Sequence, residues 1–308
     1  MRIVFMGTPE FAVPCLRSLI DAGHDVCAVF TQPDKPKGRG YALTPTPIKV
    51  LATENHIEVF QPVTLRTAQA AQIVRELNPD VIVVVAYGKI LPKEILTIPP
   101  FGCINVHASL LPKYRGAAPI QWSVINGDKV TGVTTMYMAE GIDTGDMLLA
   151  EQTEIGPDET SGELHDRLSS IGAELLVKTL QKLEEGTAKR IPQADSNTGY
   201  ASMLTKELSR INWSESANVV HNLVRGLSPW PVASAIYHDK LFKIHRTRLA
   251  DGCTGKDGQA FDENGKFIVC CGKNTAIELV EVQYEGGKRM SGKDFLRGHP
   301  IDKESILK

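Results

Sequence analysis

The chain has 308 residues, 42% of them hydrophobic, and a formal net charge of -2. This length exceeds one ordinary domain of about 100–200 residues, so we expect two domains, each with a buried core. The net charge does not point to a polyanionic partner, and no apolar run approaches the roughly 20 residues that cross a bilayer. The six cysteines form no C-x-x-C pair and, with the eight histidines, show no metal-ligand spacing. We therefore expect reduced thiols in a cytoplasmic protein.

Strand and helix patterns alternate through the first half of the chain. Such alternation predicts an α/β, Rossmann-like domain with a parallel sheet, whose ligands bind beyond the carboxyl ends of the strands. The uninterrupted apolar run at 81–86 is typical of a central strand covered on both faces. The strands are expected at 2–5, 25–30, near 58 and at 81–86, and the helices after Pro9, at 47–54 and at 68–77.

A long helix is predicted at 161–184. Thr160 and Glu163 have the spacing of a capping box at its start, and four leucines recur along one face. Residues 189–206 are polar and lack periodicity, so we interpret them as a linker. The expected division is therefore a first domain at 1–188, the linker at 189–206 and a second domain at 207–308.

The second domain has a different pattern. It carries 15 Lys or Arg and 13 Asp or Glu, a mildly basic balance of +2 on an acidic protein. Short strand-like runs with glycine-containing turns indicate a small antiparallel barrel. The expected elements are a helix at 216–226 and strands at 233–238, 241–246, 266–271 and 276–283.

Two polar residues stand at the end of a predicted strand at 103–107. Side chains of a strand alternate between its faces, so Asn105 and His107 point one way while Ile104 and Val106 point the other. The carboxyl end of such a strand is where an α/β site is expected. A capped strand end with a hydrogen-bonded structural histidine is the alternative that spacing alone leaves open.

A second polar cluster lies at 139–146, between two strand patterns. Gly141 and Gly145 bracket Asp143. A structural turn would also place glycine and aspartate there, so this run alone favours the turn.

Acyl transfer to an amine is the chemistry that unites the two clusters. Attack on the carbonyl carbon forms a tetrahedral oxyanion, to which Asn105 or a protonated His107 can donate a hydrogen bond. Asp143 can accept the proton that the amine loses, or raise the basicity of His107. The amine itself attacks, so no nucleophilic Ser or Cys is required, and the chain has no G-x-S-x-G motif.

Longer motifs around these clusters resemble a known family. The run Asn-Val-His-Ala-Ser-Leu-Leu-Pro-Lys-Tyr-Arg-Gly-Ala-Ala-Pro at 105–119, with Gly-Ile-Asp-Thr-Gly-Asp at 141–146, is similar to the folate-dependent formyltransferases. The similarity extends over the whole chain, through 4–12, 32–40 and 226–231, to the branch that acts on methionyl-tRNA. Position 232 is Val where many members have Gly, a peripheral departure that leaves the interpretation of the site intact.

The resemblance implies a reaction and a set of residues. The reaction would move a formyl group from 10-formyltetrahydrofolate, a co-substrate, to the amino group of methionyl initiator tRNA for translation initiation, without a metal or an obligate protein partner. Asn105, His107 and Asp143 would be catalytic. The folate site would comprise Ser109, Leu110, Leu111 and Pro112, with backbone at Tyr87, Gly88, Ile90, Leu91 and Gly141.

A basic, glycine-containing loop is the first expected tRNA contact. Lys35, Lys37, Arg39 and Lys49 face one acid, Asp34, which gives residues 34–49 a net charge of +3. A solvated surface loop is the ordinary interpretation of such a run. The resemblance instead implies a loop that enters the tRNA acceptor stem, with Arg39 as its key side chain, since a guanidinium binds phosphate bidentately or stacks on a base.

The second domain is the other expected contact. The resemblance implies an oligonucleotide-binding (OB-like) barrel at 207–308. Its Lys and Arg residues alternate with apolar ones around Lys243 and Arg246. We expect these two side chains to bind phosphates, with little sequence preference.

Three alternatives differ in the ligand. A formyltransferase for a small amine would need neither the basic loop nor the second domain. A dinucleotide-binding protein would have Gly7 after its first strand, but Pro9 replaces the second glycine of G-x-G-x-x-G. A non-catalytic RNA-binding protein with an inactive enzyme fold would not be expected to keep Asn105, His107 and Asp143.

Overall fold

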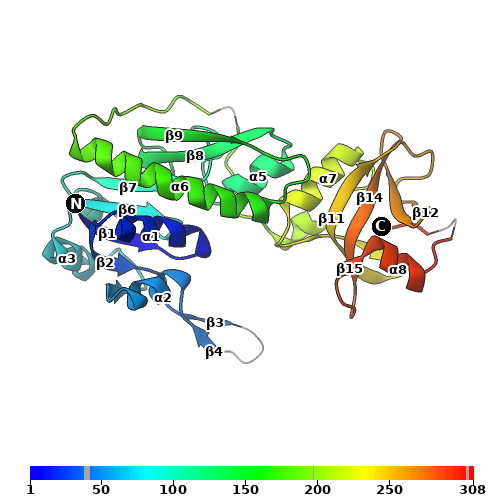
Figure 1. Ribbon diagram of the computed structural model, residues 1–308, viewed down its shortest axis with the longest axis horizontal. Coiled ribbons are helices and arrows are strands. Elements are labelled where there is room, and N and C mark those ends of the chain that lie inside the picture. Colours follow the sequence, from blue (N-terminus) through cyan, green and yellow to red (C-terminus); the bar gives the residue numbers. More distant parts are fainter. Residues whose placement is uncertain (38–41, 197, 303–304) are drawn as a thin grey trace. The chain divides into compact units, whose positions relative to one another are not determined.

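The structure is a computed structural model that describes residues 1–37, 42–196, 198–302 and 305–308. Its contacts divide the chain into two compact units (Figure 1). The first unit comprises Met1–Gly116, Gly132–Thr153 and His165–Tyr200, and the second comprises Ala117–Thr131, Glu154–Leu164 and Ala201–Lys308.

A seven-stranded sheet forms the centre of the first unit, in the order β5-β2-β1-β6-β7-β8-β9. The strands from β5 to β7 pair in parallel, which confirms the predicted α/β sheet, whereas β8 runs antiparallel to β7. The bounds are β1 (Arg2–Gly7), β2 (Asp25–Phe30), β5 (Glu58–Phe60), β6 (Val81–Val85), β7 (Cys103–His107), β8 (Val130–Tyr137) and β9 (Met147–Glu154).

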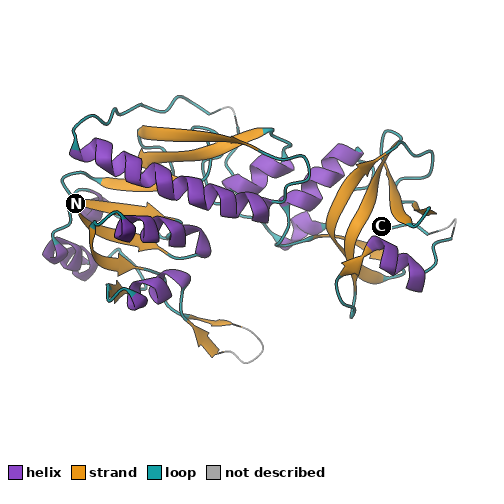
Figure 2. Ribbon diagram, viewed as in Figure 1, coloured by secondary structure: helices purple, strands orange, loops and turns teal. Residues whose placement is uncertain are grey.

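Helices lie on both faces of this sheet (Figures 1 and 2). On one face, Val4 and Met6 of β1 pack in a cluster with Val74 of α3. On the other, Ser18 of α1 donates a hydrogen bond to the carbonyl oxygen of Ala173 in α6. The helices and short turns are η1 (Glu10–Ala12), α1 (Val13–Asp21), α2 (Pro47–Glu54), α3 (Ala68–Leu77), α4 (Lys93–Leu96) and α6 (Ser161–Glu184).

Two features fix β7, the strand that ends at His107. All five of its side chains are buried, and β6 and β8 flank it in the sheet. Helix α6 passes closely over it, because a Cβ on Gly172 would lie 3.0 Å from Cγ1 of Val106. The strand is therefore held by its two neighbouring strands and by helix α6, which makes its end a rigid base for a site.

The predicted capping box of α6 is confirmed. The Thr160 N–H donates to Oε2 of Glu163 at 2.8 Å, and the Glu163 N–H donates to Oγ1 of Thr160 at 3.2 Å. The hydrogen bond from the Thr160 N–H is the main cause that lowers the pKa of the Glu163 carboxyl.

The basic segment after β2 contains a small hairpin. Its strands β3 (Lys35–Lys37) and β4 (Ala42–Thr44) pair antiparallel. The predicted tRNA contact Arg39 lies outside the described residues.

An antiparallel sheet in the order β10-β11-β14-β13-β12 forms the second unit, with β15 paired to β14. The predicted short strands and the helix near 217–226 are confirmed, whereas β12, α5 and α8 were not predicted. The bounds are α5 (Pro119–Ile125), η2 (Lys206–Ser209), α7 (Ala217–Gly226), β10 (Ala233–Tyr237), β11 (Lys240–Ala250), β12 (Ala260–Glu263), β13 (Lys266–Cys271), β14 (Thr275–Tyr284), β15 (Met290–Ser291) and α8 (Gly292–Gly298).

The last four residues connect the two ends of this sheet. The Leu307 N–H donates to the carbonyl oxygen of Gly258, two residues before β12. Lys308 exchanges two backbone hydrogen bonds with Ile236 of β10, at 2.7 and 2.8 Å. Residues 305–308, the closing segment, thus supply backbone hydrogen-bond partners at both edges of the sheet.

The expectation of reduced thiols is wrong at one pair. Cys253 and Cys270 form a disulfide, with Cα atoms 5.5 Å apart, while Cys15, Cys27, Cys103 and Cys271 are free. No sequence pattern marks this pair, because 17 positions separate its members and only the folded chain brings them together. Among the helices of the described ranges, none is long and apolar enough to cross a membrane.

Candidate active site

Asn105 and His107 lie at the carboxyl end of β7, as predicted, and both are nearly buried, with 8% and 6% of their surface exposed. The opposite face of the strand carries Ile104 and Val106, which are buried as core residues. The alternation of the strand therefore directs two polar side chains to the same side of the sheet.

Asp143 reaches these two side chains from the loop between β8 and β9. Its Oδ1 accepts from Nδ2 of Asn105 at 3.5 Å, and its Oδ2 lies 3.6 Å from Nδ1 of His107. The Asp143 side chain is 16% exposed, so it is the member of the cluster that an incoming group can reach from solvent. The structure thus brings together the three predicted residues from two separate motifs.

The backbone of Asp143 is held in an unusual conformation. Its φ is +51°, in the left-handed region that non-glycine residues rarely adopt. Close packing requires a glycine at the nearby position 145, because a Cβ on Gly145 would lie 1.9 Å from the carbonyl oxygen of Tyr137. Strained backbone of this kind concentrates at functional sites, where the surrounding structure maintains it.

Two backbone groups at 114–116 complete the cluster. The Gly116 N–H donates to Oδ2 of Asp143 at 2.9 Å, and Nε2 of His107 lies 3.0 Å from the carbonyl oxygen of Tyr114. Two acceptors therefore flank the imidazole of His107, one at each nitrogen. An imidazolium ring can donate to both of them, and a neutral tautomer to only one.

The positions predicted for folate fall into two groups. In the first group, Ser109 is fully buried, and Oγ1 of Thr134 donates to its carbonyl oxygen at 2.7 Å. The same Thr134 hydroxyl accepts from the Leu111 N–H at 3.2 Å. The segment Ser109, Leu110, Leu111 and Pro112 is thus tied to β8 directly after β7.

In the second group, side chains differ in exposure. Tyr87 and Leu91 are 1% and 4% exposed in the core, and burial raises the pKa of Tyr87 to about 12. Ile90 is 59% exposed, and Gly88 and Gly141 are exposed as well. The carbonyl oxygen of Tyr87 already accepts from the side chains of Thr8 and Gln32. A ligand here would meet Ile90 and backbone rather than the Tyr87 ring.

The predicted tRNA contacts in the described chain belong to two different units. Lys35 and Lys37 belong to the hairpin of β3 and β4, and Lys35 is exposed. Lys243 lies half-buried on β11 in the second unit. Arg246, also on β11, forms an ion pair with Glu163, so its charge is already partly neutralised.

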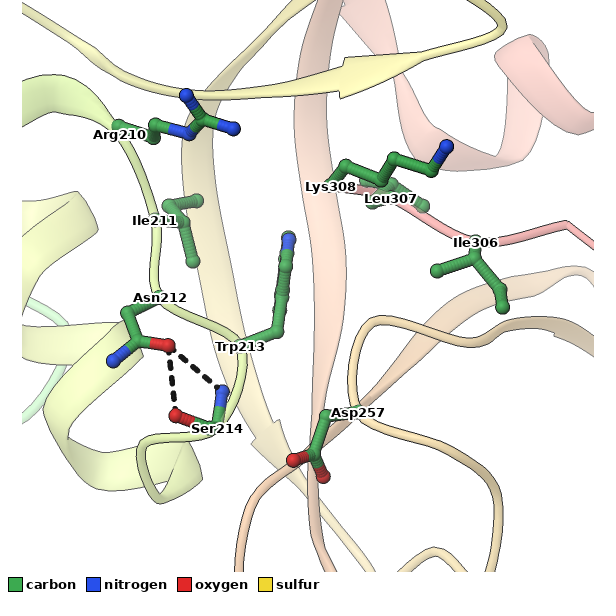
Figure 3. A pocket seen from close by; sticks show the side chains of 9 residues that line it. All are labelled: Arg210, Ile211, Asn212, Trp213, Ser214, Asp257, Ile306, Leu307 and Lys308. Carbon is green, nitrogen blue, oxygen red and sulfur yellow. Dashed lines mark hydrogen bonds between the residues drawn. The ribbon is translucent and has the colours of Figure 1, made fainter.

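The second unit also contains a hollow of about 530 Å³ (Figure 3). None of the predicted site residues lines it. Trp213 is 5% exposed there, and its Nε1 has no hydrogen-bond partner within the described ranges. The lining residues are Arg210, Ile211, Asn212, Trp213, Ser214, Asp257, Ile306, Leu307 and Lys308.

No group of three or more His, Cys, Asp or Glu side chains within the described residues is arranged to hold a metal ion. The polar side chains of the cluster at β7 are one amide, one imidazole and one carboxylate. Such groups suit hydrogen bonding to an oxyanion and proton transfer.

Comparison with known proteins assigns the family. The model of the formyl transferase family matches residues 1–180, and the model of the formyl transferase C-terminal domain matches residues 203–300. The chain belongs to the formyl transferase family. Two relatives named methionyl-tRNA formyltransferase, from Acetivibrio thermocellus and Clostridioides difficile, are 50% and 49% identical to it. These alignments cover 100% of this chain and 99% and 100% of the relatives.

Solved structures of other proteins share the fold. An N-formyltransferase from Helicobacter canadensis in complex with folinic acid and dTDP-3-aminofucose has a TM-score of 0.71 at 21% identity, covering 92% of this chain and 99% of its own. HypX from Aquifex aeolicus in complex with tetrahydrofolic acid has a TM-score of 0.64 at 17% identity, covering 100% of this chain and 50% of its own.

Sequence reasoning missed several residues around the cluster. Tyr114 and Gly116 lie within the 105–119 motif, so a signal was present, but their contribution is through backbone atoms that a motif does not reveal. Gln193 was missed because it lies in the polar stretch at 189–206. Its amide reaches the loop of Asp143, 50 residues away along the chain.

Proposed function

We propose that this formyl transferase moves a formyl group from 10-formyltetrahydrofolate to the amino group of methionyl initiator tRNA, in the cytoplasm where charged tRNA is present. The observation that carries the proposal is the convergence of Asn105, His107 and Asp143 at the end of β7. The full-length relatives at about 50% identity, which are named methionyl-tRNA formyltransferases, support the acceptor.

Each residue has a role in this reaction. The amine attacks the formyl carbon, and the resulting oxyanion accepts hydrogen bonds from Nδ2 of Asn105 and from Nδ1–H of His107, whose 3.6 Å separation from Oδ2 of Asp143 is longer than a hydrogen bond. Asp143 takes the proton that the attacking nitrogen must lose, because its carboxylate is partly exposed. Collapse of the intermediate breaks the bond to the folate nitrogen, which takes up the proton that Asp143 accepted and leaves as tetrahydrofolate.

The folate would bind beside the carboxyl ends of β6 and β7. Ser109 to Pro112 are fixed by Thr134, while Ile90 offers exposed apolar surface. The neighbours solved with folinic acid or tetrahydrofolic acid support a folate co-substrate. The reaction as proposed needs no metal and no obligate protein partner.

The functional division would follow the sequence. Residues 1–188 would carry catalysis and 207–308 would form an OB-like barrel that binds tRNA. Residues 189–206 would connect them, with Gln193 held against the loop of Asp143. The hydrogen bonds of the closing segment to both ends of the antiparallel sheet support a closed barrel.

Arg39 is the proposed contact of the basic loop with the acceptor stem. Arg39→Ala should raise the KM for charged tRNA roughly tenfold or more, because a hydrogen bond to a charged group contributes about 1.5–3 kcal/mol. The KM for folate should stay unchanged. Arg39→Lys is the control, since it keeps the charge but loses the bidentate geometry. Steady-state kinetics with each substrate varied would measure this, and an unaltered KM for tRNA in Arg39→Ala would contradict the assignment.

Lys243 is the cleaner test of the second unit, because Arg246 is paired with Glu163. Lys243→Glu should weaken tRNA binding and reduce the slope of log K against log salt by roughly 1, the loss of one phosphate contact. Filter binding at several salt concentrations measures both values. Lys178→Glu, an exposed site on α6, is the matched charge control. Equal slopes for the two variants would remove Lys243 from the interface.

The function itself is tested by a formylation assay. Purified protein is incubated with 10-formyltetrahydrofolate and methionine-charged initiator tRNA, beside uncharged tRNA and Asp143→Asn. The proposal is supported if formylmethionyl-tRNA forms with charged tRNA and the wild-type enzyme, but not with uncharged tRNA or with Asp143→Asn. Folate binding with no tRNA product would move the acceptor to a small amine, for which the aminosugar complex of the Helicobacter canadensis neighbour is the precedent.

A further inference from the structure

Gln193 holds the loop of Asp143 through both hydrogens of its amide. Its Nε2 donates to the carbonyl oxygen of Asp143 at 2.9 Å and to that of Gly145 at 2.7 Å. Both donors of the amide nitrogen are thereby used. One side chain thus bridges the residue with the unfavourable φ and the residue two positions later.

Arg115 fixes the direction of the Gln193 amide. Its Nε donates to Oε1 of Gln193 at 2.9 Å, and its Nη2 donates to the carbonyl oxygen of Ala194 at 3.3 Å. A rotated amide would place its oxygen against two carbonyl oxygens and its nitrogen against a guanidinium, so the observed orientation is the only one that pairs every group. Gln193 and Arg115 are called the amide clamp below.

The clamp touches the catalytic cluster from two sides. Arg115 directly precedes Gly116, whose N–H donates to Oδ2 of Asp143. Gln193 holds the main chain of the same aspartate. The carboxylate of Asp143 is therefore located relative to Asn105 and His107 by contacts at its side chain and at its backbone.

The flanking chain ties Gln193 itself to the sheet. Ile191 and Met147 of β9 exchange two backbone hydrogen bonds of 2.9 Å. Arg190 forms an ion pair with Asp146 and lies over the Tyr137 ring at 4.3 Å. Residues 190–194 are thus anchored on both sides of the loop they hold, as a positioning element requires.

We propose that Gln193 is a positioning residue for Asp143: its amide maintains the left-handed backbone of the aspartate and so aims the carboxylate at the proton it accepts. This inference rests on the proposed role of Asp143. A displacement of about 1 Å at a reacting group can cost roughly 100-fold in rate. Loss of the amide should therefore reduce turnover without removing any substrate contact.

Two variants separate this role from simple stability. Gln193→Met keeps the volume and loses every hydrogen bond, while Gln193→Glu keeps the contact with Arg115 but cannot donate to the two carbonyl groups. Both should lower kcat by roughly 10- to 100-fold. Both should leave the KM for folate and for charged tRNA within about threefold, since neither substitution removes a contact with a substrate. Gln181→Met is the matched control, because the side chain of Gln181 is exposed and donates a hydrogen bond to Glu185, four residues later.

A double-mutant cycle gives the deciding measurement. If Gln193 acts through Asp143, adding Gln193→Glu to Asp143→Asn should cost less than about threefold further in the single-turnover rate. Equal costs in the wild-type and Asp143→Asn backgrounds, or rates no lower than that of Gln181→Met, would overturn the inference. If Asp143→Asn itself formylates at the wild-type rate, the proposed catalytic role of Asp143 is rejected. This outcome differs from the one that rejects the role of Gln193 alone.

Discussion

Asp143→Asn is expected to lower kcat by roughly 10²- to 10⁴-fold, the range that general acid–base catalysis contributes. Asparagine keeps the shape and can still accept from the Gly116 N–H, but it cannot take a proton from the attacking amine. The KM for both substrates should therefore change little. Rapid-quench measurement of formylmethionyl-tRNA gives the rate of the chemical step.

The matched control is Asp166→Asn, the same change at an aspartate whose side chain is 85% exposed. It should turn over as the wild type does. Turnover of Asp143→Asn within about tenfold of this control would remove Asp143 from the mechanism, since proton transfer by a positioned group contributes at least about 10².

His107→Asn is expected to lower kcat by roughly 10²- to 10³-fold, the cost of removing one oxyanion donor. The imidazole lies between the carbonyl oxygen of Tyr114 and the carboxylate of Asp143, and a shorter amide cannot reach both. The loss should again fall on kcat, measured in single-turnover experiments with saturating folate.

The same substitution at His165 is the control, because the ring of that histidine packs against Phe11 and its Nδ1 lies 2.9 Å from Oδ1 of the neighbouring Asp166. A His107→Asn enzyme with the turnover of His165→Asn would show that the ring serves the fold and not the reaction.

The sequence was most informative where a local pattern determines the structure. The β-branched run of β6 and the polar pair on β7 follow from burial and from the two-residue period of a strand. These rules placed Asn105 and His107 on one face. Asp143 was joined to them by chemistry and by family resemblance, because no periodicity links the ends of two distant segments.

Contacts that depend on the folded path escaped prediction. Gln193 lies in a stretch whose polar composition resembles that of any surface segment, and its partners are main-chain carbonyl groups with no sequence signature. Arg246 was predicted as a phosphate contact before its partner Glu163 could be known. In both cases the deciding neighbours are 48 or more positions away.

The closing segment has a consequence for how the second unit is handled in the laboratory. Leu307 and Lys308 cover backbone groups next to β12 and in β10 that would otherwise face solvent. Uncovered strand edges recruit strands from other molecules, which leads to aggregation. Loss of residues 305–308 would therefore expose the two strand edges that they cover, so purification should keep these residues intact.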